Sequence, residues 1–384
     1  MHFAHQTGHA LYMAFAMFWE ILWALILGFF ISGVVQAVVS KQKIAKILGD
    51  ARPRTIAVAC ALGAASSSCS YAAVAIARAL FRKGANFTAA MAFELGSTNL
   101  VVELSIIMAI LLGWQFTLAE FLGAPLMVAI MAVLFRMFLT PEIIQQAREQ
   151  ANKRLRGVME GHAEMDMAVT EGQLFKRMLS DKGQTAISHY FVMDWVSIWK
   201  DIAGGLLLAG VLAVFVPQDG WRAFFLTSHP TLSTFWGPVV GPVVAVLSFV
   251  CSVGNIPLAS VLWNGGSSFG GVLAFIYADL IVLPILNIYR KYYGLKVSLF
   301  LFVTMFASMA VAALAVELLF KALGLIPAER HAKIVEAAIQ WNYTTILNII
   351  FLILAAMLIT RFFRTGGKKM LKMMNEVPAE HHAS

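Results

Sequence analysis

The chain has 384 residues, of which 60% are hydrophobic and only 13% are charged, and its formal net charge is +8. Ordinary soluble domains have about 25% charged residues, so this composition excludes a soluble globular fold. Positively charged loops on the cytoplasmic side of a membrane explain the basic balance better than a nucleic-acid partner does. Several apolar runs exceed the ~20 residues that a helix needs to cross a bilayer. We therefore predict an all-α polytopic membrane protein.

The first half of the chain, residues 1–139, is predicted to form one transmembrane repeat. Its full spans are expected at 15–39, 86–112 and 117–138. A fourth apolar segment, 55–80, is interrupted at 66–70 by five small residues that pack poorly in a helix.

The rest of the chain divides into three further regions. Residues 140–194 have mixed charge and no apolar span, which predicts an exposed cytoplasmic loop with some helix. Residues 195–320 are predicted to be a second transmembrane repeat, with an interrupted segment at 236–263 whose break lies at 251–255. Residues 321–384 contain one more apolar run and a basic tail, which predicts an extra transmembrane helix with a cytoplasmic end.

An internal repeat links the two interrupted segments. Shifting the chain by 182 residues aligns 33 positions without gaps, and eight of these are identical. Most other aligned pairs exchange one small or apolar residue for another. We interpret the pattern as an internal duplication of a membrane unit. The identical pairs are Cys69/Cys251, Ser70/Ser252, Ala77/Ala259, Leu80/Leu262, Gly84/Gly266, Phe87/Phe269, Ala92/Ala274 and Phe93/Phe275.

The distribution of positive charge decides how the interrupted segments are expected to cross the membrane. If both crossed fully, 15 of the 29 Lys and Arg residues would face outside. If both are re-entrant hairpins, only Arg222, Lys321, Arg330 and Lys333 do. The second arrangement predicts two inverted repeats, each with three full spans and one broken re-entrant hairpin. The N-terminus is then outside and the C-terminus cytoplasmic, in the cell (inner) membrane.

The hairpin tips are the expected substrate site, because irregular backbone at membrane depth must be buried or line a cavity. Paired cysteines at repeat-equivalent positions are either small apolar fillers or ligands for a soft electrophile. The uncharged hydrogen-bonding residues beside them are suited to a site lining, although amides also tie helices together. The predicted substrate-binding residues are Ser68, Cys69, Ser70, Asn99, Cys251, Ser252 and Asn255.

Acidic residues inside apolar runs are the candidates for ion coupling. An uncompensated acid costs at least ~2.5 kcal/mol at the bilayer centre, so such residues usually face a partner or a cavity. Asp279 has no obvious basic neighbour, which favours coupling to protons or a cation. Glu94 is a second candidate, with a structural ion pair to Arg78 as the alternative. Glu103 is a third acid of this kind. No metal site and no cofactor are expected.

The two duplicated stretches, 66–101 and 251–285, resemble the predicted permease family that includes the ArsP-like organoarsenical efflux permeases. The resemblance covers roughly residues 19–320 and implies export of a trivalent organoarsenical or a similar soft compound. In the arsenical exporters the first motif carries a Cys-Ser-Cys run followed by a proline. This chain has Ser68-Cys69-Ser70-Tyr71 there, and the proline occurs only in the second copy, as Pro257. The departure removes one thiol from the site.

Two classes of function remain open from the sequence. One is a secondary transporter that exports a small substrate by alternating access between the two tips. The other is an integral membrane subunit that binds a ligand or a partner without transport. The chain has no G-x-x-x-x-G-K-[ST] motif, which argues against direct use of ATP, and no metal-hydrolase motif in its spans, so an enzyme is not expected. Expected partners are the lipid bilayer, a small substrate, protons or a cation, and a second copy of the chain.

Overall fold

The computed structural model describes residues 2–38, 45–67, 70–152, 167–169, 173–215, 218–248, 252–330, 332, 341 and 343–375. All regular secondary structure in these ranges is helical. The predicted all-α class is confirmed to that extent.

The helices follow the predicted spans and interruptions closely. The first half contains α1 (His2–Val38), α3 (Pro53–Ser66), α4 (Ser70–Arg82), α5 (Phe87–Asn99), α6 (Val102–Leu111) and α7 (Trp114–Phe138). Between the halves lie α8 (Pro141–Asn152) and α10 (Leu174–Leu179). The second half contains α11 (Asp181–Phe215), α12 (Gln218–Phe224), α13 (Pro230–Ser248), α14 (Ser252–Asn264), α15 (Phe269–Tyr277), the 3-10 turn η1 (Ala278–Leu280), α16 (Leu283–Tyr293) and α17 (Leu295–Ala322). The chain continues with α18 (Tyr343–Arg364) and α19 (Gly367–Asn375).

Several helical stretches are long and apolar enough to span a bilayer. In the described part of the chain there are six, and a seventh if α5 and α6, which meet at an angle of 41°, count as one bent span. The six are Ile21–Val38, Trp114–Phe138, Pro230–Ser248, Phe269–Tyr293, Leu295–Ala322 and Thr344–Arg364. The protein is therefore a multi-pass helical membrane protein.

Helix boundaries recur at the spacing of the sequence repeat. α4 and α14 end at the equivalent residues Arg82 and Asn264, and α5 and α15 begin at Phe87 and Phe269. The turn before α5 and the turn before α15 each contain a glycine with positive φ, +106° at Gly84 and +107° at Gly266. Side chains with a Cβ rarely adopt this backbone conformation, which explains why glycine occupies both turns.

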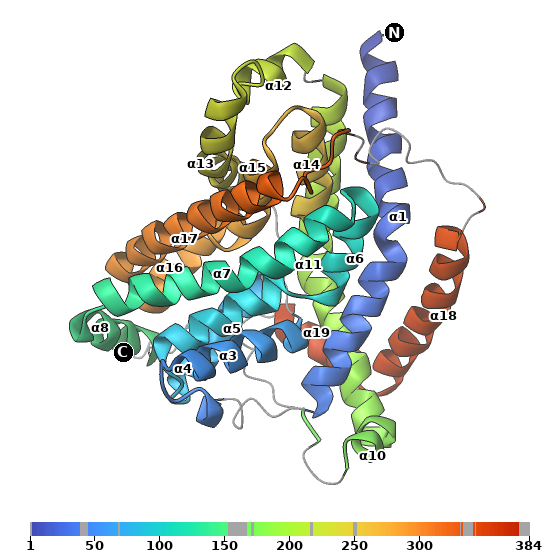
Figure 1. The fold of residues 1–384 in the computed structure, drawn as a ribbon. Coiled ribbons are helices and arrows are strands. Elements are labelled where there is room, and N and C mark those ends of the chain that lie inside the picture. Colours follow the sequence, from blue (N-terminus) through green and yellow to red (C-terminus); the bar gives the residue numbers. More distant parts are fainter. Residues whose placement is uncertain are drawn as a thin grey trace, which may run out of the picture.

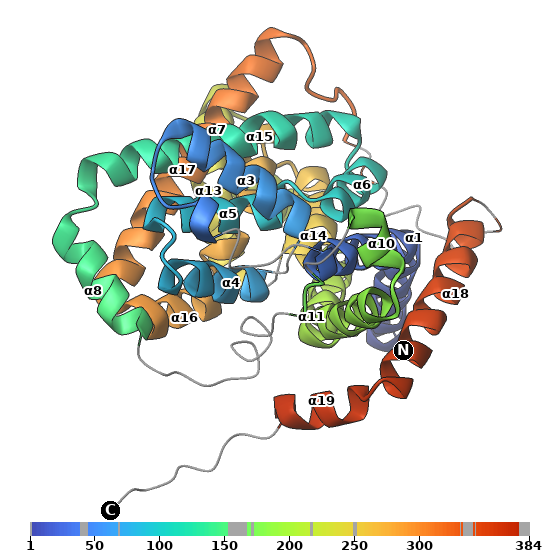
Figure 2. The ribbon, with the colours of Figure 1, turned by 90° about the horizontal axis from the view of Figure 1, so that it is seen from below.

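Equivalent helices of the two halves pack against each other. α1 packs along α11, and α7 packs along α17. Figure 2 shows α1 and α11 side by side, with α18 at their flank. The N-terminal end of α1 and α12 lie at one end of the molecule, and α10 lies at the other (Figure 1).

Within each half, one helix pair packs with its backbones in close approach. A Cβ on Gly63 of α3 would overlap the Phe93 carbonyl of α5, and a Cβ on Gly96 of α5 would overlap the Cys60 carbonyl of α3. In the second half, Gly241 of α13 lies in the same way against the Gly271 carbonyl of α15. Small residues at such contacts let membrane helices approach closely and gain dispersion energy.

Two boundaries differ from the sequence expectation. α11 begins at Asp181, so the charged stretch ends in a helix whose Ser188, His189 and Asp194 are buried against neighbouring helices. The predicted break at 251–255 is helical where the structure describes it, because α14 includes Ser252–Asn255. The re-entrant course of both interrupted segments stays a prediction.

Candidate functional site at the helix breaks

The described parts of two helices meet at repeat-equivalent positions near the centre of the molecule. They are α4, which is described from Ser70 onward, and α14, which is described from Ser252 onward. The Ser252 backbone N–H donates a hydrogen bond to Ser70 Oγ at 3.3 Å. Both residues are buried, at 0% and 4% exposure. The predicted approach of these two serines is therefore observed.

The Asp279 carboxylate lies at the same point. Ser70 Oγ donates to Asp279 Oδ2 at 2.7 Å. The Thr98 hydroxyl of α5, which donates to the Leu95 carbonyl at 3.3 Å, lies near this carboxylate. Asp279 Oδ1 has no hydrogen-bond partner in the ranges that the structure describes. We refer to Ser70, Thr98, Ser252 and Asp279 as the break cluster. It joins α4 and α5 of the first half to α14 and η1 of the second.

A proline in the sequence explains why Asp279 lies at a break. Pro284 is at the start of α16, and because it has no N–H it cannot continue the hydrogen-bond ladder of the preceding helix. The chain therefore leaves α15 at Tyr277, makes the 3-10 turn η1, and begins α16 at Leu283. Asp279 sits in this turn and is completely buried.

The two predicted asparagines flank the break cluster. Asn99 ends α5, and its Nδ2 donates to the Leu95 carbonyl at 3.2 Å and to Thr98 Oγ1 at 3.0 Å. Asn255 lies one helical turn after Ser252 on α14 and is completely buried. Among the described residues, neither amide atom of Asn255 has a hydrogen-bond partner, nor does Asn99 Oδ1. Buried polar groups without partners are costly unless a ligand or water satisfies them.

Glu94 is bound by a tyrosine and not by the predicted arginine. The Tyr289 hydroxyl of α16 donates to Glu94 Oε1. The alternative ion pair with Arg78 is wrong, because the Arg78 guanidinium instead donates to the Ala151 carbonyl, at 2.9 and 3.2 Å, and stacks over the Tyr292 ring. Glu94 lies one turn before Thr98 on α5 and interacts electrostatically with Asp279.

A second group of buried polar residues surrounds the end of α3. Its residues at 66–67 and Glu103 were recognised in the sequence, but Ser32 and Asp194 were not. The Ser32 hydroxyl of α1 lies within hydrogen-bonding distance of the carbonyls of Ser66 (3.1 Å) and Ser67 (2.7 Å) and of Asp194 Oδ2 (3.0 Å). The Ser67 hydroxyl donates to Glu103 Oε1 of α6. We call Ser32, Ser66, Ser67, Glu103 and Asp194 the α3-end cluster. Asp194 is an acid within an apolar run, so the rule that identified Glu94 could have found it.

Two more buried acids were missed in the same way. Glu317 of α17 accepts from Ser268 Oγ at 2.8 Å and from the Gly270 N–H at 3.0 Å, so it caps the start of α15. Glu120 of α7 is 1% exposed, and neither of its carboxylate oxygens has a hydrogen-bond partner in the described parts of the chain. The first acid has a structural role, and the second has none that its contacts explain.

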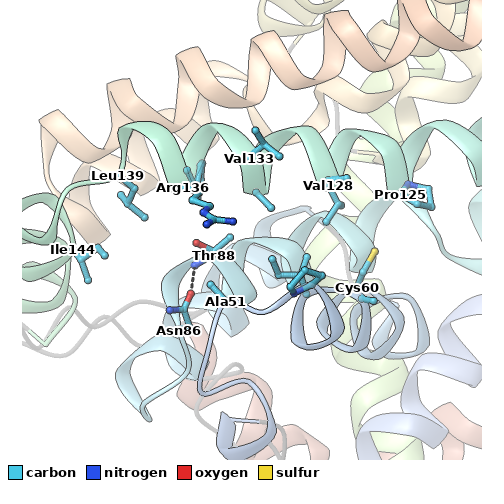
Figure 3. A pocket seen from close by; sticks show the side chains of 16 residues that line it. Ala51, Cys60, Asn86, Thr88, Pro125, Val128, Val133, Arg136, Leu139 and Ile144 are labelled. Carbon is cyan, nitrogen blue, oxygen red and sulfur yellow. Dashed lines mark hydrogen bonds between the residues drawn. The ribbon is translucent and has the colours of Figure 1, made fainter.

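Three predicted site residues, Ser68, Cys69 and Cys251, lie outside the described residues. The remaining cysteine, Cys60, is not at the break cluster. It borders an apolar cavity of about 520 Å³ between α3, α7 and the start of α5, together with Thr88, Pro125 and Arg136 (Figure 3). No group of three or more His, Cys, Asp or Glu residues with metal-binding geometry occurs in the described ranges.

The break cluster presents hydroxyl groups and a carboxylate in the buried centre. The Asp279 carboxylate accepts from Ser70 Oγ, which itself accepts from the Ser252 N–H. Broken helices with polar side chains at their ends are the usual way in which membrane transport proteins bind substrates and coupling ions.

These features define the class: a helical membrane protein with broken helices and buried hydrogen-bonding groups at its centre. Comparison with known proteins identifies the family. The model of a family described as "Predicted permease" matches residues 6–318, and the chain belongs to this family. It is 60% identical over 346 residues to "Putative permease Rv2963" of Mycobacterium tuberculosis, covering 90% of this chain and 85% of that protein. No solved structure matches. The family identifies a membrane transporter of a small substrate and not an enzyme.

Proposed function

We propose that the protein is a secondary transporter that exports a small substrate by alternating access at the break cluster. One observation carries the proposal: the repeat-equivalent Ser70 and Ser252 are hydrogen-bonded to each other, and Ser70 is bonded to the buried Asp279. A membrane protein has little reason to bury such groups at helix breaks unless they take part in binding.

The proposed mechanism rests on two inverted repeats, residues 1–139 and 195–320, which rock against each other around the cluster. The equivalent ends of α4 and α14 support a structural duplication, as do the glycine turns before α5 and α15. The contacts of α1 with α11 and of α7 with α17 would then be the interfaces at which the repeats move. The loop within 140–194 and the helix after residue 321 would lie outside the repeat.

The proposed orientation in the cell (inner) membrane has the N-terminus outside and the C-terminus in the cytoplasm. Lys83 and the 140–194 region are then cytoplasmic, whereas Arg222 and Arg330 face out, which follows the positive-inside rule. Single-cysteine labelling on a cysteine-free background tests it. Lys83→Cys should resist an impermeant reagent added to intact cells, and Arg222→Cys should react. The opposite result would exclude both the orientation and the re-entrant hairpins.

The proposed substrate class is a trivalent organoarsenical or a similar soft compound. The support is the family resemblance together with the thiols of Cys69 and Cys251, which the sequence repeat assigns to equivalent positions, and soft electrophiles prefer thiolate ligands. A protection screen in a sensitive host, with arsenicals, mercurials and simple anions, tests the class. If the double variant Cys69→Ser plus Cys251→Ser protects as well as the parent, the thiols are not ligands. Recognition then rests on Asn99, Ser252 and Asn255.

Asp279 and Glu94 are the proposed coupling residues, with protons as the favoured ion. Both are completely buried, and they interact electrostatically with each other. Flux into vesicles that contain only this chain tests the function as a whole. Uptake of the compound found in the screen, driven by an imposed proton gradient, is expected. Binding of that compound without uptake would instead identify a non-transporting membrane subunit.

A further inference from the structure

Glu120 is a buried acid for which the fold provides no partner. It lies on α7, two turns from the start of the helix, and is 1% exposed. Neither Oε1 nor Oε2 has a hydrogen-bond partner within the ranges that the structure describes. This differs from Glu317, Glu103 and Glu94, each of which accepts a hydrogen bond from a serine or tyrosine hydroxyl.

A tyrosine hydroxyl reaches the same part of α7. Tyr277 is the last residue of α15 and is completely buried, and its hydroxyl also has no hydrogen-bond partner among the described residues. This hydroxyl lies against Gly123, so closely that a Cβ at that position would overlap it. Gly123 is three residues after Glu120, so it is on the same side of the helix. Tyr277 and Glu120 interact electrostatically.

No charged group that the structure describes near Glu120 acts as its counter-ion. The described titratable and charged groups on the elements packed against α7 are Arg54 and Cys60 on α3, Glu94 on α5, Glu103 on α6, Tyr277 on α15, and Lys296, Glu317 and Lys321 on α17, and Asp279 lies in η1, directly after α15. Of these, Asp279 and Tyr277 are the groups that interact electrostatically with Glu120. Asp279 is itself an acid, so it makes a second negative charge at Glu120 less favourable.

An ionised carboxylate that is buried without a hydrogen bond or a cation is strongly disfavoured in a low-dielectric interior. A bound metal ion would remove the difficulty, but it needs several ligands, and no suitable group of His, Cys, Asp or Glu residues is present in the described chain. A proton needs only the carboxylate itself. The neutral acid carries no charge, so its burial is disfavoured far less.

We propose that Glu120 and Tyr277 form a proton-binding site next to the break cluster, in which Glu120 is protonated in this conformation and exchanges its proton with Asp279 during transport. In the exchange, the O–H bond of Glu120 breaks and an O–H bond forms at a carboxylate oxygen of Asp279, so the negative charge moves from Asp279 to Glu120. The exchange rests on the proposed transport function. The protonation of Glu120 does not, and it can be measured without a substrate.

Infrared spectroscopy of the whole protein in lipid tests the protonation, because a protonated carboxyl has a C=O stretch that is separate from the carboxylate bands. The spectra are recorded over a pH series for the parent and for Glu120→Gln. We expect the variant to lose the protonated-carboxyl signal of a single side chain at neutral pH. Glu142→Gln is the matched control, because Glu142 is exposed on α8 and should contribute no such signal at that pH. An unchanged signal in folded Glu120→Gln would overturn the proposal.

Two further variants keep Glu120 and test its surroundings. Tyr277→Phe removes the phenol hydroxyl, and Gly123→Ala displaces it from α7. Both should change the pH at which the Glu120 signal disappears. A normal pH profile in both variants would remove Tyr277 from the site, and these two variants also decide the question if Glu120→Gln fails to fold.

The exchange with Asp279 is tested by Asp279→Asn, which should also shift the pH profile of the Glu120 signal. If the profile is unchanged, Glu120 does not exchange its proton with Asp279. Because these spectra need no substrate, a protonated Glu120 in a protein that fails the vesicle assay would reject transport and leave the proton site standing.

Discussion

The broken segments of the two halves are held in different ways, although the sequence repeat relates them. At the end of α3, the carbonyls of Ser66 and Ser67 are bound by Ser32 of α1, and the Ser67 hydroxyl is bound by Glu103. On α14, the buried amide of Asn255 has no hydrogen-bond partner among the residues that the structure describes. The α3-end cluster therefore completes the fold around the first-half segment, whereas the Asn255 amide of the second-half segment has no such role among the described residues.

This difference indicates which of the two broken segments is held in place by the fold and which one is expected to bind substrate. A side chain whose polar atoms are satisfied by neighbouring helices gives rigidity, and one that is left unsatisfied costs stability unless it has a function. The first-half segment is connected to α1, α6 and α11 through the α3-end cluster. We therefore expect substrate to be recognised mainly from the α14 side, with Asp279 between the two segments.

The largest expected effect is that of Asp279→Asn, which removes the only titrating member of the break cluster. The amide keeps the shape and can still accept from Ser70, so the variant should fold, but it cannot bind and release a proton. We expect concentrative transport in vesicles to fall to background. Asp50→Asn is the control, because Asp50 is an exposed acid before α3 and should transport normally. Normal pH-dependent transport by Asp279→Asn would exclude its coupling role.

Much of this arrangement could be predicted from local patterns. The run of small residues at 66–70 marks the end of α3, and the repeat predicts equivalent starts for α5 and α15. The start of α11 could not be predicted in this way, because Asp181 and Lys182 have the composition of a loop. They become helical because the residues that follow pack against α1 and α18, and such tertiary contacts override local propensity.

Individual residues of the candidate site could be predicted from the sequence, but the contacts between them could not. Asp279 and Ser70 were each recognisable, one as an acid in an apolar run and the other as a repeated serine. Their contact joins residues that are 209 positions apart, and it depends on how the halves pack, which no local pattern records. Glu120 and Asp194 are also acids in apolar runs, so the pattern that singles out Asp279 singles out these two residues as well.

A second prediction concerns the first-half segment, which the α3-end cluster holds in place. Gly28 of α1 lies against the Cβ, Cγ and Cδ atoms of Glu103, and a Cβ at Gly28 would overlap them. Gly28→Ala should therefore displace Glu103 from Ser67 and destabilise the protein by ~1–3 kcal/mol, the usual cost of overpacking. Thermal unfolding in detergent measures the change.

The matched control for Gly28→Ala is Gly204→Ala on α11, where an added Cβ meets no atom within 4 Å. There the substitution should stabilise the helix by about 0.5–1 kcal/mol, because glycine is a poor helix former. Equal effects of the two variants would show that the α3-end cluster does not fix the first-half segment.

A third prediction compares the two repeated serines. The Ser70 hydroxyl accepts from the Ser252 N–H and donates to Asp279, so Ser70→Ala breaks two hydrogen bonds and leaves both partners buried. Hydrogen bonds between membrane helices contribute ~0.6 kcal/mol on average, up to ~1.7 kcal/mol, so we expect a loss of ~1–2 kcal/mol. Ser252 contributes its backbone to the cluster, and Ser252→Ala should cost less than ~0.5 kcal/mol. Equal losses in thermal unfolding would contradict this asymmetry.

The last expected change is a gain in stability, and it tests the α14 segment, from which we expect substrate to be recognised. Asn255 buries an amide without a partner in the described structure, so Asn255→Leu exchanges a costly polar group for an apolar one of similar size. Removing an unsatisfied amide should stabilise the protein by about 1 kcal/mol. Transport should fall at the same time, because the amide is then no longer available to the substrate. Higher thermal stability together with lower vesicle uptake is the signature of a group kept for function. A variant that loses stability would show instead that Asn255 supports the fold, and the two segments would then differ less than their contacts indicate.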